Sequence, residues 1–546
     1  MTRRAFFGSL LLLFTLVWFG NLQYRHLLKA DEGRYAEISR EMAASGDWVT
    51  PRLNGIKYFE KPPLQYWTTA AAYKIFGEHE WTARLWTALT GWLGVLLAFF
   101  TARRLWGEQA GLYAALVLGS SALYVMVGHV NALDMGLTFF MSLALSGFLL
   151  SQSRADDVPY RRRWMLVAWA GAALAVLSKG LIGLVLPGAV LVAYTLWARD
   201  WGIWKRLHLV PGIALFLLIA APWFVAVSLA NPEFARFFFV HEHFERFLTK
   251  VHGRYQPWYD FIPILLGGML PWLVALFPAL ARAWAGDFGQ RGFRPRHFLL
   301  AWAAVIFLFF SASSSKLPAY ILPVFSALAL LIGDYLGKAP LRSLARQNGL
   351  LLGLGGALIG VAAFKYQAWL ADNASGPLHE AYAPWLLAAA AVWMAGAVGA
   401  MTTAWWQHRL ASVLALAAGG LLAAQLAVTG HETLSPSNSG YHFAQKVRPH
   451  LTPDSTLYCL EMYDQTLPFY LQRTCTLVAH QDELAFGLAQ EPDKWIPDRA
   501  AFLAALPAKR DAIVFMAPDI YDQLVAQGVP LRLLARDTRR AAATPE

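Results

Sequence analysis

Long apolar runs, separated by short polar connections, fill residues 1–430 of this chain. An apolar run of about 17–25 residues is long enough to cross the hydrocarbon core of a bilayer as a helix. About thirteen segments have or approach that length: 6–21, 82–101, 108–127, 132–150, 164–178, 180–197, 207–229, 261–283, 297–311, 317–336, 349–364, 384–401 and 409–429. The pattern therefore predicts an α-helical polytopic membrane protein with about thirteen transmembrane helices.

The pattern changes in residues 431–546, where short apolar runs alternate with polar turns. Four runs are strand candidates and one, between the first two strands, is helix-like: 456–462, 474–480, 511–516 and 529–534, with 464–473 as the helix. Such alternation is typical of a small α/β domain with a partly parallel sheet. We expect this domain to end in a disordered basic tail from Arg536. Its Cys459 and Cys475 form either one disulfide or two buried thiols.

The composition supports a membrane protein and disfavours a nucleic-acid-binding one. Hydrophobic residues make up 57% of the chain and charged residues only 15%, against about 25% charged residues in soluble domains. Lysine and arginine outnumber aspartate and glutamate by 46 to 35, a net charge of +11. These basic residues are scattered between apolar runs and form no separate basic domain of the kind that binds nucleic acid.

The basic residues also predict the orientation in the membrane. With the N-terminus in the cytoplasm, five short inner connections are basic, as the positive-inside rule requires; the residues concerned are Arg103, Arg104, Arg154, Arg161, Arg162, Arg163, Arg199, Lys205, Arg206, Arg291, Arg294, Arg296, Lys338, Arg342 and Arg346. An odd number of spans then places residues 431–546 outside the cytoplasm. The outer loops 23–81 and 230–260 are also rich in lysine and arginine, although the positive-inside rule does not require basic residues on that side. Their basic residues are either solvated surface charges or part of a pocket for an anion.

The first outer loop contains candidate chemistry at two places. Residues 32–44 have apolar positions at helical spacing, which predicts a short amphipathic helix in the membrane interface. Asp31, at the start of this helix, is either a helix cap or a functional acid. Further along, two prolines in the run YFEKPPL, residues 58–64, fix the backbone around Lys61. Lys61 either binds a phosphate as a compact charge or forms a weak surface ion pair.

Other outer segments offer cationic groups for the same anion. Arg246 and Arg254 lie in the second outer loop, among aromatic residues suited to the headgroup region. Lys316 and Tyr320 follow a serine run in a later outer loop. We expect these four side chains to approach the anion that Lys61 meets.

Two further sets of residues have open interpretations. His241 and His243 fit two ligands of a divalent metal such as zinc, with Glu60 as the third, but ordinary hydrogen-bonded histidines are the alternative. Asp134 lies near the outer mouth of the fourth predicted span, where an acid is either a buried partner for lysine or arginine or a catalytic group. We favour the supporting role for Asp134.

An ordered series of motifs resembles the bacterial lipid A aminoarabinose transferases, which are relatives of the protein O-mannosyltransferases with a C-type glycosyltransferase fold. In the first outer loop the matching motifs are DEGRYAE at 31–37, GDW at 46–48, NG at 54–55 and YFEKPPLQYW at 58–67. Further matches follow along the chain: NALD at 131–134, SKG at 178–180, HFERF at 243–247, KLPAY at 316–320 and LPFYL at 467–471. The resemblance thus covers almost the whole chain.

The resemblance implies an inner-membrane enzyme that acts on the periplasmic side. Its donor would be undecaprenyl phosphate–4-amino-4-deoxy-L-arabinose and its acceptor a lipid A phosphate, and the product would confer resistance to polymyxin and cationic antimicrobial peptides. The essential acid of the family falls on Asp31. A pocket around Asp31 would include Glu32, Tyr35, Tyr58 and Glu60. No cofactor is required, and the oligomeric state is left open.

Two other functions compete with a glycosyltransferase. A transporter of lipid-linked sugars would bind the same phosphate, but it needs polar sites at the membrane midplane and repeated, broken helices. A receptor with a soluble tail leaves the charged outer loops unexplained. Within the glycosyltransferase interpretation, another sugar or another acceptor, including a protein, is the alternative. The predicted domains are a transmembrane glycosyltransferase domain, 1–430, and a periplasmic α/β domain, 431–546.

Overall fold

The computed structural model describes residues 3–245, 256–286, 292–313, 315–371 and 376–546. Its contacts divide the chain into two compact units. The first, here called the helical unit, comprises Met1–Asn21, Trp86–Asn373 and Ala383–Gly430. The second, here called the α/β unit, comprises Leu22–Leu85, Ala374–Tyr382 and His431–Glu546. The predicted outer loop 23–81 therefore belongs to the same compact unit as the C-terminal part of the chain.

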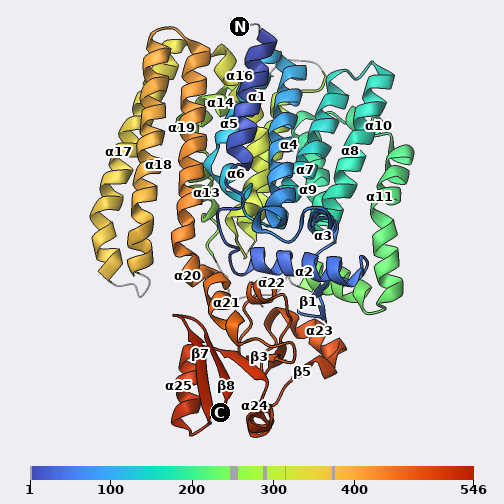
Figure 1. Ribbon diagram of the computed structural model, residues 1–546. Helices are drawn as coiled ribbons and strands as arrows, with labels where there is room; N and C mark the ends of the chain where they lie inside the picture. Colours follow the sequence, from blue (N-terminus) through green and yellow to red (C-terminus); the bar gives the residue numbers. More distant parts are fainter. Residues whose placement is uncertain (1–2, 246–255, 287–291, 314, 372–375) are drawn as a thin grey trace. The chain divides into compact units, whose positions relative to one another are not determined.

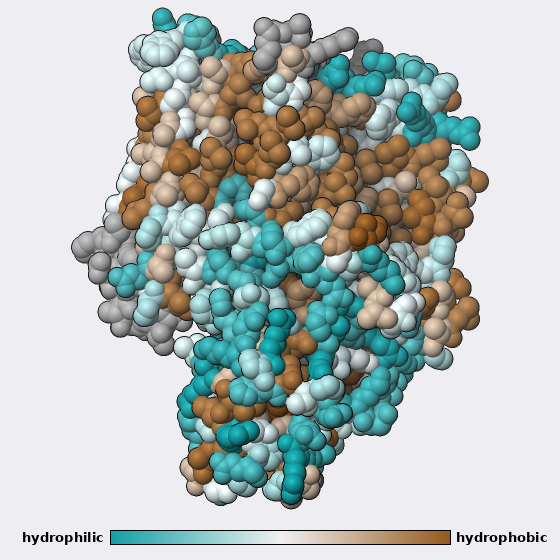
Figure 2. Space-filling view, in the orientation of Figure 1, coloured by the Kyte–Doolittle hydropathy of each residue, from teal (hydrophilic) through white to brown (hydrophobic). Residues whose placement is uncertain are grey.

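The helical unit is built almost entirely of helices (Figure 1). In chain order its elements are α1 (Arg3–Phe19), α4 (Glu80–Trp106), α5 (Glu108–Ser120), α6 (Ala122–Val127), α7 (Leu133–Ser153), α8 (Val158–Lys179), α9 (Ile182–Ala198), α10 (Gly202–Lys205), α11 (Leu209–Ala230), the π-helix η1 (Arg236–Glu245), α13 (Phe261–Gly268), α14 (Leu273–Gly286), α15 (Pro295–Ala312), the 3₁₀-helix η2 (Pro318–Ile321), α16 (Leu322–Lys338), α17 (Leu341–Ala371), α18 (Gly376–Trp405) and α19 (Arg409–Gly430). The first residues of α4, 80–85, and of α18, 376–382, belong to the α/β unit. Apolar residues cover much of its surface in Figure 2. A lipid environment accounts for such a surface.

Each predicted apolar segment overlaps one of these helices or a pair of them, so the prediction of an α-helical membrane fold is confirmed. Within the described residues, eight helices are long and apolar enough to cross a membrane, or nine if α13 and α14, bent by 104°, count as one span. This count is lower than the predicted thirteen. The difference arises because α1 and α9 have only 17 residues each, because the predicted span 108–127 is divided between α5 with 13 residues and α6 with 6, and because α8 carries three consecutive arginines near its start.

Small residues allow the helices of this unit to pack closely. A Cβ atom on Gly147 of α7 would lie 2.9 Å from the backbone nitrogen of Ala168 in α8, and one on Gly171 of α8 would lie 2.7 Å from that of Ala144. Gly396 and Gly419 bring α18 and α19 together in the same way. Close backbone approach of this kind stabilises helix pairs where lipid weakens the hydrophobic drive to associate.

The α/β unit begins with a helix, a hairpin and a second helix. These are α2 (Asp31–Ser45), β1 (Arg52–Leu53) with β2 (Ile56–Lys57), and α3 (Leu64–Phe76). Asn54 and Gly55 both have positive φ, 57° and 74°, as a two-residue Asn-Gly hairpin turn requires. The predicted amphipathic character of α2 is wrong, because Glu37 and Arg40 are buried along with its apolar residues. Their mutual ion pair makes this burial tolerable.

The rest of the α/β unit is an α/β domain around one mixed sheet (Figure 1). Its helices are η3 (His431–Leu434), α20 (Ser435–Asn438), α21 (Tyr441–Val447), η4 (Arg448–His450), α22 (Leu467–Leu471), η5 (Asp482–Leu484), α23 (Ala485–Gln490), η6 (Pro492–Lys494), α24 (Arg499–Ala505), η7 (Leu506–Ala508) and α25 (Pro518–Ala526). Its strands are β3 (Thr456–Leu460), β4 (Thr476–Val478), β5 (Trp495–Ile496), β6 (Ala512–Met516), β7 (Leu531–Arg536) and β8 (Ala541–Pro545).

The strand order is β5-β4-β3-β6-β8-β7, with β5, β4, β3 and β6 parallel and β8 antiparallel to both of its neighbours. The prediction of a partly parallel sheet is therefore confirmed. The prediction of a disordered tail is wrong, because β8 lies inside the sheet and Ala541, Ala542 and Ala543 are fully buried. The alanine-rich sequence of β8 lacks the β-branched and aromatic residues that mark most strands. Cys459 and Cys475 form a disulfide between β3 and the start of β4.

Candidate active site

The start of α2 carries a short chain of charged side chains centred on Arg34. Arg34 Nη1 lies 2.8 Å from Asp31 Oδ1, and Arg34 Nε lies 2.5 Å from Glu483 Oε2. Gln465 Nε2 donates to the other oxygen of Glu483 at 2.7 Å. The Asp31 side chain is 46% exposed, whereas those of Arg34 and Glu483 are largely buried. Asp31 thus presents its carboxylate to solvent while a buried arginine holds it from one side.

Asp31 does not cap the helix, because the cap position is Ala30 and no side chain caps it. Gly33 lets this part of α2 approach the segment that carries Gln465, since a Cβ atom there would lie 2.7 Å from the Gln465 carbonyl oxygen. Burial raises the pKa of Glu483, and Arg34 opposes that rise. Glu483, from η5, is one residue that sequence reasoning missed.

Glu32 forms a buried ion pair with Arg84. Its two carboxylate oxygens lie 2.7 and 2.8 Å from Nε and Nη2 of Arg84, and both side chains are fully buried. Arg84 also donates to the carbonyl oxygens of Leu22, Arg25 and His26. The predicted pocket residue Glu32 therefore anchors the segment before α2, and Arg84, its partner, was not predicted.

Tyrosines surround the Arg34 cluster. The rings of Tyr35 and Tyr66 lie 6.1 Å apart, and the charges of Arg34, Glu60 and Glu483 act on both Tyr58 and Tyr66. Burial, the largest cause, raises the pKa of Tyr58 and of Tyr66 well above the ordinary value, so both keep their proton. Both hydroxyls are buried and have no hydrogen-bond partner within the described ranges. Because an unsatisfied buried polar group costs about 1–3 kcal/mol, these hydroxyls are suited to donate to a bound ligand.

Lys61 lies beside Glu60 at the turn before α3. Its Nζ donates to the Glu60 carbonyl oxygen at 2.8 Å and lies 3.7 Å from Glu60 Oε2. Both side chains are mostly buried, with 17% and 18% of their surface exposed. The Lys61–Glu60 pair is therefore mostly buried, unlike the surface ion pair that was one of the two interpretations of Lys61 from the sequence.

The helical unit holds a second polar cluster. Lys179 is at the end of α8, and Asp134 is in the first turn of α7. The Nζ atom of Lys179 lies 2.5 Å from Asp134 Oδ1 and 4.7 Å from the ring centroid of Tyr320. Of the two interpretations of Asp134, the structure shows the ion pair. Lys316 is buried, donates to the Ser313 carbonyl oxygen and lies 5.7 Å from the ring of Phe261.

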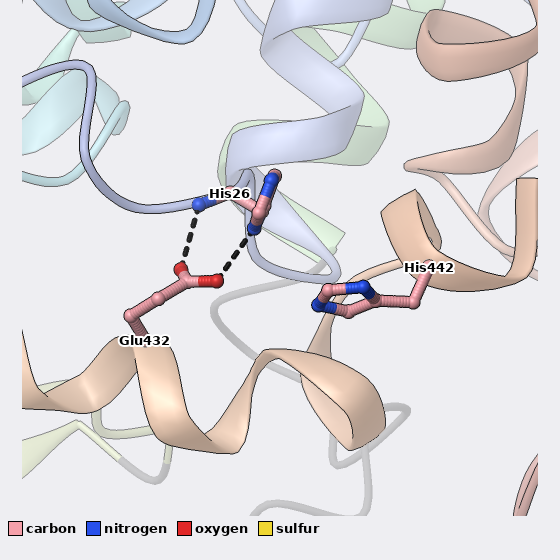
Figure 3. Close-up of side chains that lie close together, drawn as sticks. All are labelled: His26, Glu432 and His442. Atoms are coloured by element: carbon pink, nitrogen blue, oxygen red, sulfur yellow. Dashed lines mark hydrogen bonds and ion pairs between the residues drawn. The ribbon is translucent and has the colours of Figure 1, made fainter. Parts of the chain in front are cut away.

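The predicted residues of the second outer loop are described only in part. His241 belongs to η1, is exposed, and stacks on Phe237 with ring centroids 5.3 Å apart. Arg246, Arg254 and the side chain of His243 lie outside the described residues. Among the side chains that are described, the group able to hold a metal ion is a different one, His26, Glu432 and His442 (Figure 3).

Each unit therefore brings some predicted residues together. In the α/β unit, Asp31, Tyr35 and Tyr58 lie around Arg34, and the charge of Glu60 acts on Tyr58. In the helical unit, Asp134 and Tyr320 meet at Lys179. The sequence carried a signal for Arg34, because it stands one helical turn after Asp31. It carried none for Glu483, which lies about 450 residues further along the chain.

Comparisons with known proteins identify two family models in this chain. Residues 5–238 match the dolichyl-phosphate-mannose-protein mannosyltransferase family, and residues 443–544 match the aminoarabinose transferase C-terminal domain. Two relatives are named undecaprenyl phosphate-α-4-amino-4-deoxy-L-arabinose arabinosyl transferase. The protein from Edwardsiella ictaluri is 36% identical over 65% of both chains, and the one from Pseudomonas aeruginosa is 36% identical over 67% of this chain and 66% of its own. The alignments span about two thirds of the length of these relatives.

Solved structures extend the likeness to the whole chain. The crystal structure of ArnT from Cupriavidus metallidurans bound to undecaprenyl phosphate is 40% identical, covers 99% of this chain and 98% of its own, and superposes with a TM-score of 0.93. The Archaeoglobus fulgidus oligosaccharyltransferase, at 13% identity and a TM-score of 0.50, covers 98% of this chain and 72% of its own. At that identity it shares only the fold.

Proposed function

The chain belongs to the aminoarabinose transferase family, with its C-type glycosyltransferase fold, and from this premise we propose its reaction. It transfers 4-amino-4-deoxy-L-arabinose from undecaprenyl phosphate to a lipid A phosphate on the periplasmic face of the bacterial inner membrane. The product lowers the negative charge of lipid A and so gives resistance to polymyxin and cationic antimicrobial peptides. The observation that carries the proposal is the full-length likeness to a structure that holds undecaprenyl phosphate.

The proposed chemistry is a direct displacement at the anomeric carbon. An oxygen of the acceptor phosphate forms the new bond to this carbon, the bond to the donor phosphate oxygen breaks, and undecaprenyl phosphate leaves with the electron pair. The acceptor is already an anion, so it needs no strong general base. The main tasks of the protein are then to position two phosphates and to stabilise the charge on the leaving one.

The cations and the tyrosine predicted from the sequence serve the departing phosphate in this scheme: Lys61, Arg246, Arg254, Lys316 and Tyr320. Lys316 is buried and partly desolvated, and a cation interacts more strongly with an anion when water is excluded. The protonated, buried hydroxyls of Tyr58 and Tyr66 are available as additional donors.

Asp31 is the proposed catalytic residue. Its exposed carboxylate either orients the acceptor or stabilises positive charge that develops on the sugar. Arg34 fixes the carboxylate from the buried side, and Glu483 fixes Arg34 in turn. We assign Arg34 and Glu483 as positioning residues. Glu32, Tyr35 and Glu60 support this arrangement from within the α/β unit.

Two observations support the periplasmic placement of the α/β unit and a cytoplasmic N-terminus. The disulfide between Cys459 and Cys475 is typical of an oxidising compartment. The short connections that would face the cytoplasm are basic.

No step of the proposed reaction passes through a metal. The ligand set His241, His243 and Glu60 gains no support from the described residues, because Glu60 lies beside Lys61 and His241 stacks on Phe237. A divalent metal such as zinc at these residues would hold the loops and leave the displacement unchanged.

The reaction is tested with purified protein, undecaprenyl phosphate–aminoarabinose and lipid A in detergent. Formation of modified lipid A together with an equal amount of free undecaprenyl phosphate is the expected result. A lipid-linked sugar transporter would leave donor and acceptor chemically unchanged. Release of undecaprenyl phosphate only with another acceptor, such as a protein, would redirect the proposal to that acceptor.

A further inference from the structure

Three side chains outside the proposed active site form a compact group in the α/β unit (Figure 3). His26 lies in the segment before α2, Glu432 in η3 and His442 in α21. One potential ligand atom from each residue lies within 4.8 Å of the other two. The proposed displacement uses none of them.

Two of the three are already held in place. His26 Nδ1 lies 2.5 Å from Glu432 Oε1, and the His26 backbone N–H donates to Glu432 Oε2 at 2.9 Å. The His26 ring also stacks on Tyr441, with ring centroids 3.7 Å apart and planes inclined by 22°. These contacts fix the imidazole and the carboxylate relative to each other before any ligand binds.

The third residue comes from a separate helix. His442 directly follows Tyr441, and its ring lies 5.3 Å from the His26 ring in an edge-on arrangement. Its Nε2 lies 3.0 Å from the hydroxyl oxygen of Ser435. Figure 3 shows it reaching toward the His26–Glu432 pair. Because His442 is exposed, its ring has room to turn toward the other two.

We propose that His26, Glu432 and His442 bind one zinc ion. Two imidazoles and one carboxylate are a known zinc ligand set that leaves the fourth position for water, and imidazole ligands disfavour magnesium and calcium. Zinc bonds of about 2.0–2.2 Å place tetrahedral ligands roughly 3.4 Å apart. The His26–Glu432 contact must widen slightly and His442 must move inward, which its exposure permits. The nearby cation Arg25, whose charge interacts with Glu432, opposes a dication, so we expect micromolar affinity.

The zinc ion would act as a clamp on the segment that leads into α2. His26 precedes Asp31 by five residues, and Glu432 and His442 lie more than 400 residues further along the chain. A single ion would therefore join two distant parts of the α/β unit, five residues before the proposed catalytic acid in the sequence.

The experiment uses the full-length protein in detergent, stripped with a chelator and titrated with zinc chloride alone, then with cobalt chloride. The expected result is one equivalent bound with micromolar affinity, a visible absorption band of tetrahedral cobalt, and a higher melting temperature with zinc. His442→Ala should weaken binding at least tenfold and lose both the band and the thermal shift. His450→Ala, another exposed histidine in the same unit, should behave like the wild type.

Because His442 is exposed, its variant should fold, and a metal-free melting temperature equal to that of the wild type verifies this. Equal zinc affinity in the wild type and His442→Ala would overturn the proposal. Loss of the bound ion in His241→Ala, with His442→Ala unaffected, would also overturn it, since the ion would then belong to the second outer loop.

Discussion

One helix from each unit, α7 and α2, differs in how many charged side chains it buries. In the helical unit, α7 has 21 residues and one acidic side chain, Asp134, which pairs with Lys179. In the α/β unit, α2 has only 15 residues, yet it buries Glu32, Glu37 and Arg40. The comparison shows that α7 is packed mainly through small residues at helix contacts, whereas α2 is held largely by buried ion pairs.

This difference has an energetic basis. Between membrane helices the hydrophobic drive is weak, so close packing at glycine and alanine provides much of the stability. In the α/β unit, burying Glu32 and Arg84 is tolerable only because each satisfies the other with two short hydrogen bonds. A substitution that adds volume at a helix contact should therefore destabilise the helical unit. A substitution that removes one charge of a buried pair should destabilise the α/β unit.

The largest effect is expected at Asp31, the proposed catalytic acid, whose side chain is half exposed and pairs with Arg34. Asp31→Asn removes the exposed carboxylate but keeps the side-chain size. Transfer should fall on the order of a thousandfold or more, as for the loss of a group that stabilises developing charge, while the melting temperature changes little. The measurement is the initial rate of sugar transfer from the undecaprenyl donor.

The matched control for this variant is Asp493→Asn, since Asp493 is exposed in the same unit. Its rate should equal that of the wild type. A normal transfer rate in Asp31→Asn would remove Asp31 from the proposed mechanism.

Breaking the buried ion pair should destabilise the α/β unit. In Glu32→Gln, Arg84 stays buried without its carboxylate partner, and such a loss costs about 3–5 kcal/mol. We expect a melting temperature lower by many degrees, or failure to purify as a folded protein. Asp522→Asn is the control, because it breaks the Arg536–Asp522 pair, in which both side chains are exposed, and should leave the melting temperature unchanged. Equal melting temperatures for the two variants would contradict the comparison.

The sequence predicted the fold of the helical unit and of the α/β unit from different local signals. Apolar runs place the helices of the helical unit, because lipid requires each span to be continuous and apolar. Strands β3, β4, β6 and β7 were placed to within a few residues for a related reason, since each is rich in branched or aromatic residues. Strand β8 was missed because Ala541, Ala542 and Ala543 carry no such signal, and its burial depends on neighbours on both sides.

The candidate site is predictable to the same limited extent. Local motifs identified Asp31 and Lys61 as candidates, because their backbone setting can be recognised within a few residues. The partners that hold them could not be found locally. Glu483 meets Arg34 only through the fold of the C-terminal part of the chain. Even for Asp134, the sequence predicted a basic partner but did not single out Lys179.

Volume should matter more than charge in the helical unit. Gly147→Ala adds one methyl group, which would lie 2.9 Å from the Ala168 backbone nitrogen and force α7 and α8 apart. Overpacking of this kind costs about 1–3 kcal/mol. The expected result is a lower melting temperature in detergent. Gly188→Ala, where a Cβ atom would meet nothing within 4 Å, should leave it unchanged or raise it slightly, because alanine favours the helix more than glycine does. An equal loss in both variants would contradict the packing explanation.

The smallest expected effect is the most informative about the α/β unit. Glu483→Gln keeps the size of the side chain and removes the negative charge that meets Arg34 Nε. Arg34 should remain paired with Asp31, because their contact at 2.8 Å is local to α2, but it loses its second anchor. Since misplacement of a catalytic group lowers the rate of the chemical step, we expect kcat to fall about tenfold with KM nearly unchanged. Glu483→Asp, which restores the charge on a shorter side chain, should recover part of the rate. A variant that loses stability and keeps its kcat would assign Glu483 to folding alone and remove it from the positioning of Asp31.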